Sequence, residues 1–220
     1  MTSSSPTETS LRWAPWWVLA FVALWPLHGP AELVLSLGAL VALAVLAVFR
    51  FRGGMSLLSH EAWALTSVLF CAYWLPELIS SFDAVDASRA LRESLVDLRY
   101  LPFLWLVAMA VANERSRQLT FGGIAVIAAL WAVDALVQAA TGWSLGGPAT
   151  ADRLSGVFGA ENLKLGLVLA SLAPFPLTLA AKRFGLPGWL LVALALGIVV
   201  LLAGARASWV TLTLVLLISG

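Results

Sequence analysis

The stretch AELVLSLGALVALAVLAVF, residues 31–49, decides the fold class. It is close to the ~20 mostly apolar residues that an α-helix needs to cross a bilayer. Arg50 and Arg52 follow it directly, and paired basic residues commonly mark the cytoplasmic end of a spanning helix. The stretch therefore predicts a membrane-spanning helix.

Similar apolar runs recur along the whole chain. Together they place candidate spans at about 13–27, 31–49, 62–80, 100–112, 119–141, 163–181, 189–203 and 207–219. The pattern predicts an all-α polytopic membrane protein with about eight transmembrane helices. Residues 1–12 are polar and are expected to form a disordered cytoplasmic N-terminus, and residues 13–220 the transmembrane helical domain.

The composition agrees with a membrane protein. Hydrophobic residues make up 61% and charged residues 11% of the 220 residues, against about 45–50% and ~25% in soluble domains. These values exclude an ordinary soluble domain, a disordered chain and a nucleic-acid binder.

Cys71 is the only cysteine, and the two histidines, His28 and His60, are not spaced as metal ligands, so we expect no metal and no cofactor.

The positions of the basic residues predict the orientation. Those expected on the cytoplasmic side occur mostly as tight pairs after spans, as stop-transfer anchors do: Arg12, Arg50, Arg52, Arg115, Arg117, Lys182 and Arg183. The remaining ones lie in one amphipathic segment or beside glycine-rich span ends. We therefore expect a cytoplasmic N-terminus and a working face on the outer side.

The segment FDAVDASRALRESLVDLR, residues 82–99, predicts an interfacial helix on the outer leaflet, with its charges among the lipid headgroups. Arg89 and Glu93 form an i,i+4 pair. The alternative is that Arg89, Arg92 or Arg99 holds an anionic lipid headgroup.

Asp134 and Gln138 lie one helical turn apart near the outer end of the 119–141 span. An ionisable residue within a span should face a polar interior. Asp134 is expected to pair with an outer cation such as Arg153, Lys164 or Arg206. A structural hydrogen-bonded contact and a direct role in a site both remain open.

The segment DRLSGVFGAENLKLG, residues 152–166, combines glycines with Arg153 and Lys164 just before a span. Asn162 or Glu161 could cap the following helix. A helix N-terminus with cations nearby favours an anion, and the glycines allow backbone amides to approach a ligand.

In the segment LLAGARASWVTL, residues 201–212, Arg206 stands between two apolar spans. An arginine deep in a span costs ~3 kcal/mol, so it would need an anionic partner there, and its planar fork suits a phosphate. The alternative is an arginine that snorkels to the outer interface. The three outer patches together favour a lipid-linked anionic substrate, most simply a pyrophosphate.

The last two segments resemble the O-antigen ligase / O-antigen polymerase superfamily, and bacterial O-antigen ligases most closely. The first element consists of Arg153, Gly156, Phe158 and Asn162, and the second of Gly204, Arg206, Ala207 and Trp209. The resemblance implies a GT-C-like helical bundle in the bacterial inner membrane, with its active face in the periplasm. It implies an inverting, metal-independent glycosyl transfer from an undecaprenyl-pyrophosphate-linked glycan donor to a lipid A–core acceptor.

Within that resemblance, Arg206 matches the arginine that handles the pyrophosphate, and Arg153 and Asn162 match the earlier element. Lys164, Asp134 and Arg89 are further candidate substrate-binding residues. The family places its catalytic histidine in a large periplasmic loop after the second element, beyond Gly220, so the chain is expected to be an N-terminal part that binds the donor without turnover. His28 and His60 precede both elements, and neither is assigned that role.

Two alternatives remain open. An O-antigen polymerase or a protein O-oligosaccharyltransferase of the same superfamily would have the same donor site and another acceptor. A membrane transporter is the weaker alternative, for which Pro174 and Pro176 could break a span.

Overall fold

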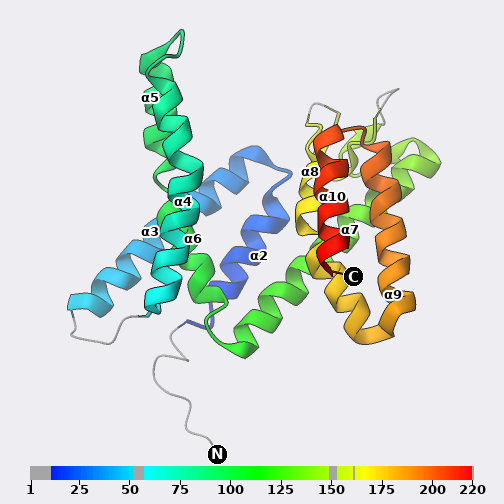
Figure 1. The fold of residues 1–220 in the computed structure, drawn as a ribbon, viewed down its shortest axis with the longest axis horizontal. Helices are drawn as coiled ribbons and strands as arrows, with labels where there is room; N and C mark the ends of the chain where they lie inside the picture. The colour runs from blue at the N-terminus through cyan, green and yellow to red at the C-terminus, as the bar shows by residue number, and fades with distance from the viewer. Residues whose placement is uncertain (1–10, 52–56, 149–152, 161, 220) are drawn as a thin grey trace, which may run out of the picture. The chain divides into compact units, whose positions relative to one another are not determined.

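The computed structural model describes residues 11–51, 57–148, 153–160 and 162–219. These residues are almost entirely helical, apart from one two-stranded hairpin and a 3₁₀ turn (Figure 1). The elements are α2 (Ala14–Leu24), α3 (His28–Phe51), α4 (His60–Ser81), α5 (Ala87–Asp97), α6 (Tyr100–Ala110), α7 (Glu114–Thr141), β1 (Trp143–Ser144), β2 (Gly147–Pro148), η1 (Gly156–Phe158), α8 (Leu165–Leu172), α9 (Pro174–Leu202) and α10 (Arg206–Ser219).

Among the described residues, four helices are long and apolar enough to cross a membrane: α3, α4, α7 and α9. This confirms the all-α class and indicates a membrane protein. The number of about eight spans is not confirmed, because α2 and α10 are apolar but shorter and α5 and α6 have only 11 residues each. The predicted disordered N-terminus falls outside the described residues except at Leu11 and Arg12, where Leu11 is buried and begins a turn into α2.

Helix α9 consists of two helical parts. Gly185 has φ 65° and ψ −153°, a backbone conformation that only glycine adopts easily. The ribbon reverses direction near this residue (Figure 1). The reversal falls between the two spans that the sequence predicts at about 163–181 and 189–203.

The chain divides into two compact units, residues 1–120 and 121–220, which we call unit 1 and unit 2. The core of unit 1 lies where α2, α3 and α6 meet, around Leu35, Phe103 and Leu106. Gly38 permits the close approach of α2 and α3, because a Cβ atom there would lie 2.5 Å from the Trp17 indole nitrogen. That nitrogen donates a hydrogen bond to the Val34 carbonyl at 2.9 Å.

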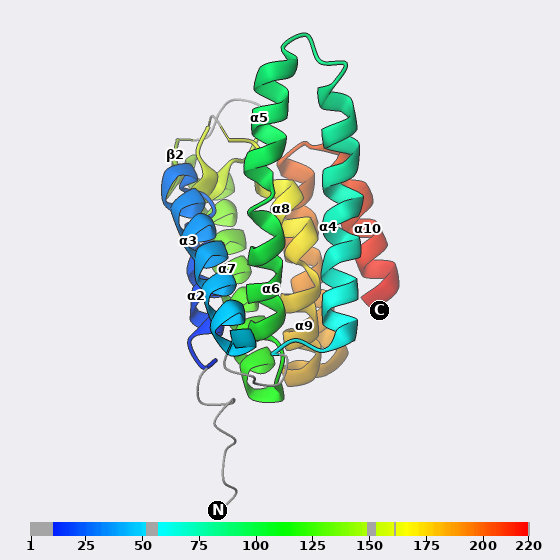
Figure 2. The same cartoon turned by 90° about the vertical axis from the view of Figure 1, so that its left-hand side faces the viewer.

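Helices α4, α5 and α6 of unit 1 form an antiparallel hairpin. Ser59 caps α4 by accepting a hydrogen bond from the Ala62 amide, and α5 runs back along the end of α4. The Trp74 indole donates to the Ser94 carbonyl at 2.8 Å, which joins the two helices. Figure 2 shows α5 continuing in the direction of α6. The helix expected within residues 82–99 is therefore present, packed on α4, and its location at a membrane surface stays a prediction.

Unit 2 contains most of α7 together with α8, α9 and α10. Its core includes Leu165, Leu169, Leu177 and Leu196, which are all fully or almost fully buried. The start of α8 lies against the end of α9 and the start of α10, because a Cβ atom on Gly166 would be 3.0 Å from Ala203 and 3.2 Å from the Ser208 hydroxyl. This contact brings three chain segments to one end of unit 2.

Candidate functional site

The candidate site lies at one end of unit 2. The end of α7, the β1–β2 hairpin, η1, the start of α8 and the α9–α10 link meet there (Figure 1). The backbone amide of Leu154 donates to the Leu202 carbonyl at 3.2 Å, which joins the segment before η1 to the end of α9. The two sequence elements of the family resemblance therefore lie side by side, although about 40 residues separate them in the chain.

Gln138 is the central polar residue of this end. Its side chain is almost completely buried, and its Oε1 accepts hydrogen bonds from the amides of Ser155 and Gly156 at 3.0 and 2.8 Å. Its Nε2 lies 3.1 Å from the Ser144 hydroxyl, 3.4 Å from the Gly147 carbonyl and 3.3 Å from the Ser155 hydroxyl. One neutral side chain on α7 thus holds both the hairpin and the segment that leads into η1.

Asp134 performs a similar structural role one turn earlier. Its Oδ1 accepts a hydrogen bond from the Leu145 amide at the tip of the hairpin, at 2.8 Å. Its Oδ2 is buried without a hydrogen-bond partner among the described residues and would lie 3.4 Å from a Cβ atom on Gly156. The expected ion pair with Arg153, Lys164 or Arg206 does not form among the described residues, so that expectation is wrong. The bond to Leu145 is a structural contact, and a direct role of Asp134 in a site stays a prediction.

Glycines make the loop compact. A Cβ atom on Gly146 would overlap the Gly156 carbonyl oxygen and lie 2.6 Å from the Gly159 nitrogen. Gly156 has φ 51°, in the left-handed region that favours glycine. These positions let the hairpin tip rest directly on the backbone of η1.

Two aromatic residues of the family elements anchor the loop to the core. Phe158 is buried, and its ring packs edge-on against Trp131 with centroids 5.3 Å apart. The Trp209 indole donates to the Val200 carbonyl at 3.2 Å, which ties the start of α10 to the end of α9. Packing accounts for Gly156 and Phe158, and the indole hydrogen bond gives Trp209, which is 42% exposed, a structural contact.

The two arginines of the elements differ from these anchors, because both are exposed. Gly204 has φ 72°, and a Cβ atom there would lie 3.4 Å from Cγ and Nε of Arg153. The Arg153 side chain therefore passes over Gly204, two residues before Arg206 begins α10. Among the described residues, no carboxylate forms an ion pair with Arg206.

Lys164 and Asn162 lie at the start of α8. Lys164 is exposed and occupies the N-cap position without a side-chain hydrogen bond to the helix. Asn162 is half-buried, and its backbone amide donates to the Gly159 carbonyl at 3.1 Å. The prediction that Asn162 caps this helix is wrong, since the helix begins at Leu165 and Lys164 precedes it; Glu161 lies outside the described residues.

Arg89 belongs to unit 1. It is exposed on α5 and forms the predicted i,i+4 ion pair with Glu93 at 3.0 Å. The Asp86 carboxylate caps α5 by accepting from the Arg89 amide, and this bond lowers the pKa of Asp86. A role of Arg89 in substrate binding stays a prediction.

Arg99 of unit 1 also has a structural role, because it connects two helices. It forms an ion pair with Glu32 on α3 and donates to the Ser36 hydroxyl at 3.1 Å. The sequence offered Arg99 as a possible headgroup ligand, but its guanidinium joins the start of α6 to α3. Sequence reasoning missed Glu32 as its partner; the signal available was an acidic residue near the start of a long apolar helix.

Within the described residues, no three His, Cys, Asp or Glu side chains lie close enough together to hold a metal ion. No model of a known protein family matches the chain, and neither does any curated protein or solved structure at a significant level.

Proposed function

We propose that this chain carries the donor-binding part of an O-antigen ligase-type glycosyltransferase. In this proposal a glycan moves from undecaprenyl pyrophosphate to a lipid A–core sugar at the periplasmic face of the bacterial inner membrane. One observation carries the proposal: the Arg153 side chain lies over Gly204, beside the start of α10 and Arg206. The two elements that resemble the family in sequence are also neighbours in space.

The residues at this end of unit 2 fall into two groups, those that hold the loop and exposed cations, and this separation supports the proposed function. Gln138, Asp134 and Phe158 hold the loop through hydrogen bonds from backbone amides and through ring packing, without an ion pair among the described residues. Arg206 and Lys164 are exposed and form no ion pair among the described residues. Cations that the fold does not require for packing are available for an anionic ligand.

The chemistry of a pyrophosphate leaving group suits these residues. Charge builds on the leaving pyrophosphate as the glycosidic bond breaks, and preorganised cations stabilise that charge. The guanidinium fork of Arg206 or Arg153 can donate two parallel hydrogen bonds to one phosphate. The resemblance assigns neither His28 nor His60 as the base that accepts the proton of the attacking hydroxyl.

The proposal also includes the finer topology. Counting α6 as one span, α8 with the first part of α9 as another, and the second part of α9 as a third gives eight crossings, with α5 at the outer membrane surface. The reversal at Gly185 supports this count. With a cytoplasmic N-terminus, eight crossings place the end that carries Arg153 and Arg206 in the periplasm, as a GT-C-like bundle requires.

Donor binding is the first test. The chain in nanodiscs is titrated with undecaprenyl pyrophosphate and, separately, with undecaprenyl monophosphate. We expect the pyrophosphate to bind more tightly, and Arg206→Ala and Arg153→Ala each to weaken it about tenfold, since a charge-assisted hydrogen bond contributes about 1.5–3 kcal/mol. The matched control is Arg183→Ala, an exposed arginine of the same unit. Equal affinity of all four proteins would overturn the site.

Complementation identifies the acceptor. The gene that encodes this chain is expressed in a ligase-deficient Gram-negative strain, with wild-type and Arg206→Ala sequences at equal membrane levels. A lipopolysaccharide ladder that only the wild type restores supports the ligase. Binding without a ladder directs the search to the growing glycan of a polymerase or the protein hydroxyl of an O-oligosaccharyltransferase.

The transporter alternative gains no support. The break between α8 and α9 does fall at Pro174. Ala173 nevertheless keeps helical angles, φ −52° and ψ −35°, and its carbonyl accepts from the Leu177 amide at 3.1 Å. The helix therefore continues through the break, without the unwound backbone that lines transporter sites.

A further inference from the structure

Unit 1 contains an open apolar groove between α4 and α6. Its volume is about 430 Å³, within the range of about 300–1,000 Å³ for small-molecule sites. The lining residues are Leu69, Phe70, Tyr73, Tyr100, Phe103 and Leu104. Phe70 and Phe103 are buried and form the floor.

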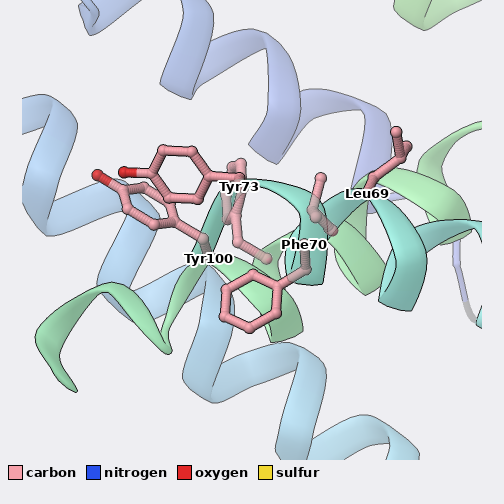
Figure 3. A pocket seen from close by; sticks show the side chains of 6 residues that line it. Leu69, Phe70, Tyr73 and Tyr100 are labelled. Atoms are coloured by element: carbon pink, nitrogen blue, oxygen red, sulfur yellow. The ribbon is translucent and has the colours of Figure 1, made fainter. Parts of the chain in front are cut away.

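The groove has one apolar end and one polar end. Figure 3 shows the hydroxyl oxygens of Tyr73 and Tyr100 on the same side, with Leu69 at the opposite end. The two rings meet edge-on with centroids 6.0 Å apart. Tyrosines, which combine an apolar ring with a polar hydroxyl, are typical of the level of the lipid headgroups, so the groove has the polarity of a single amphipathic lipid.

The charge at the polar end is negative. The Tyr73 hydroxyl donates to Oδ2 of Asp97 at 2.8 Å, and Asp97 forms no ion pair among the described residues. Arg99, whose guanidinium lies 5.7 Å from the centroid of the Tyr100 ring, is already neutralised by Glu32. Glu77, one turn after Tyr73 on α4, also forms no ion pair there, and its Oε2 is buried without a hydrogen-bond partner among the described residues. Two carboxylates, Asp97 and Glu77, therefore remain without a cationic partner, and an ammonium group at Asp97 would complement this negative end.

The location of the groove on a candidate membrane span favours a lipid as its occupant. Helix α4 is one of the candidate membrane spans, and most of its surface is exposed rather than packed on other helices. We propose that this groove binds an acyl chain of one phospholipid with an amine headgroup, such as phosphatidylethanolamine, with the ammonium at Asp97. This inference does not depend on the proposed glycosyl transfer, because Asp97 and the groove belong to unit 1.

The test is native mass spectrometry of the full chain, taken from vesicles with equal amounts of phosphatidylethanolamine and phosphatidylglycerol. We expect one retained phosphatidylethanolamine per chain in the wild type. Leu69→Trp, which fills the apolar end, should lower that retained fraction at least fivefold. Leu65→Trp is the matched control, because Leu65 lies one turn earlier on α4, has a similar exposure of 61% against 54%, and does not line the groove.

A second variant tests the headgroup. Asp97→Asn should lower the ratio of retained phosphatidylethanolamine to phosphatidylglycerol at least threefold, while Asp83→Asn on the exposed α4–α5 turn should leave it unchanged. Three results would each overturn the proposal: equal lipid retention by the wild type and Leu69→Trp, equal retention of the two phospholipids by the wild type, or an isoprenoid lipid found in place of the phospholipid.

Discussion

Unit 1 and unit 2 place their polar groups differently. In unit 1 the charged side chains hold helices to one another, as Arg99 and Glu32 join α6 to α3. In unit 2 the neutral side chain of Gln138 holds the loop, through the amides of Ser155 and Gly156. The Asp134 carboxylate adds a bond from the Leu145 amide, and neither of these anchors uses Arg206 or Lys164, which form no ion pair among the described residues. This difference favours unit 2 as the place where an anionic substrate binds.

The largest expected effect comes from removing the centre of the unit 2 loop. Gln138→Leu leaves the buried amides of Ser155 and Gly156 without an acceptor, at about 1–3 kcal/mol for each unsatisfied group. We expect a loss of about 2–5 kcal/mol and a Tm lower by about 5–15 °C, followed by thermal unfolding in detergent with tryptophan fluorescence. Donor binding should fall with it.

The control is Gln118→Leu on the same helix. Gln118 is exposed and donates to Glu114 at 2.7 Å, so its loss should change stability by less than about 0.5 kcal/mol. If both variants lower the Tm equally, Gln138 does not organise the loop and the contrast between the units disappears.

The second effect concerns the ion pair of unit 1. A double-mutant cycle with Glu32→Ala and Arg99→Ala should give a coupling of about 1–2 kcal/mol, because the two side chains are 33% and 27% exposed and a partly desolvated pair is screened less than a surface pair. The donor affinity should not change in any of these variants.

The matched cycle uses Arg89 and Glu93, whose side chains are 76% and 63% exposed. An exposed i,i+4 pair is worth about 0.3–0.5 kcal/mol. Equal coupling free energies in the two cycles would show that the Glu32–Arg99 pair stabilises unit 1 no more than an exposed surface pair does.

The third effect tests the glycine beneath Arg153. Gly204→Ala forces a residue with a Cβ atom into the conformation with φ 72°, which should cost about 1–2 kcal/mol and displace the Arg153 side chain. Gly197→Ala in the interior of α9 has no atom near its Cβ position and should stabilise by about 0.5–1 kcal/mol. Donor affinity should fall only for Gly204→Ala; an unchanged affinity would separate Arg153 from the site.

The sequence predicts the helices better than the site. Long apolar runs such as 31–49 and 119–141 appear as α3 and α7 because hydropathy and length determine a spanning helix. The pattern of residues 82–99 predicts a helix, but the packing of that helix on α4 depends on single contacts such as Trp74 to Ser94, which leave no periodic signal in the sequence. Tertiary contacts of this kind cannot be predicted from the spacing of apolar and polar residues within one segment.

The candidate site also contains residues that the sequence indicates and residues whose roles it does not reveal. The sequence indicates Arg153, Lys164 and Arg206 as candidates because a cation beside a glycine-rich span end costs free energy near the membrane. The sequence shows Gln138 only as a neighbour of Asp134, because its amide carries no charge. The role of Gln138 depends on backbone groups 17 and 18 residues away. The error at Asp134 has the same origin: its partner is the Leu145 amide, which every residue offers.

The smallest effect tests whether the charges of unit 1 are structural down to a single helix cap. The Asp86 carboxylate accepts from the Arg89 amide at 3.0 Å and from the Ser88 hydroxyl at 2.9 Å, and these bonds lower the pKa of Asp86. Its contribution is therefore present above the unfolded pKa of about 3.9 and is lost as the pH falls through the lowered pKa of the folded state.

Hydrogen exchange of the Arg89 amide measures this cap. Its protection factor should drop as the pH falls below 4 in the wild type and stay constant in Asp86→Asn, because the asparagine oxygen also accepts a hydrogen bond. The Ala62 amide provides an internal control, since it is capped by the Ser59 hydroxyl at 3.1 Å, which does not titrate in this range. A parallel fall at both amides would mean that the helices open together, and that no single charge holds the start of α5.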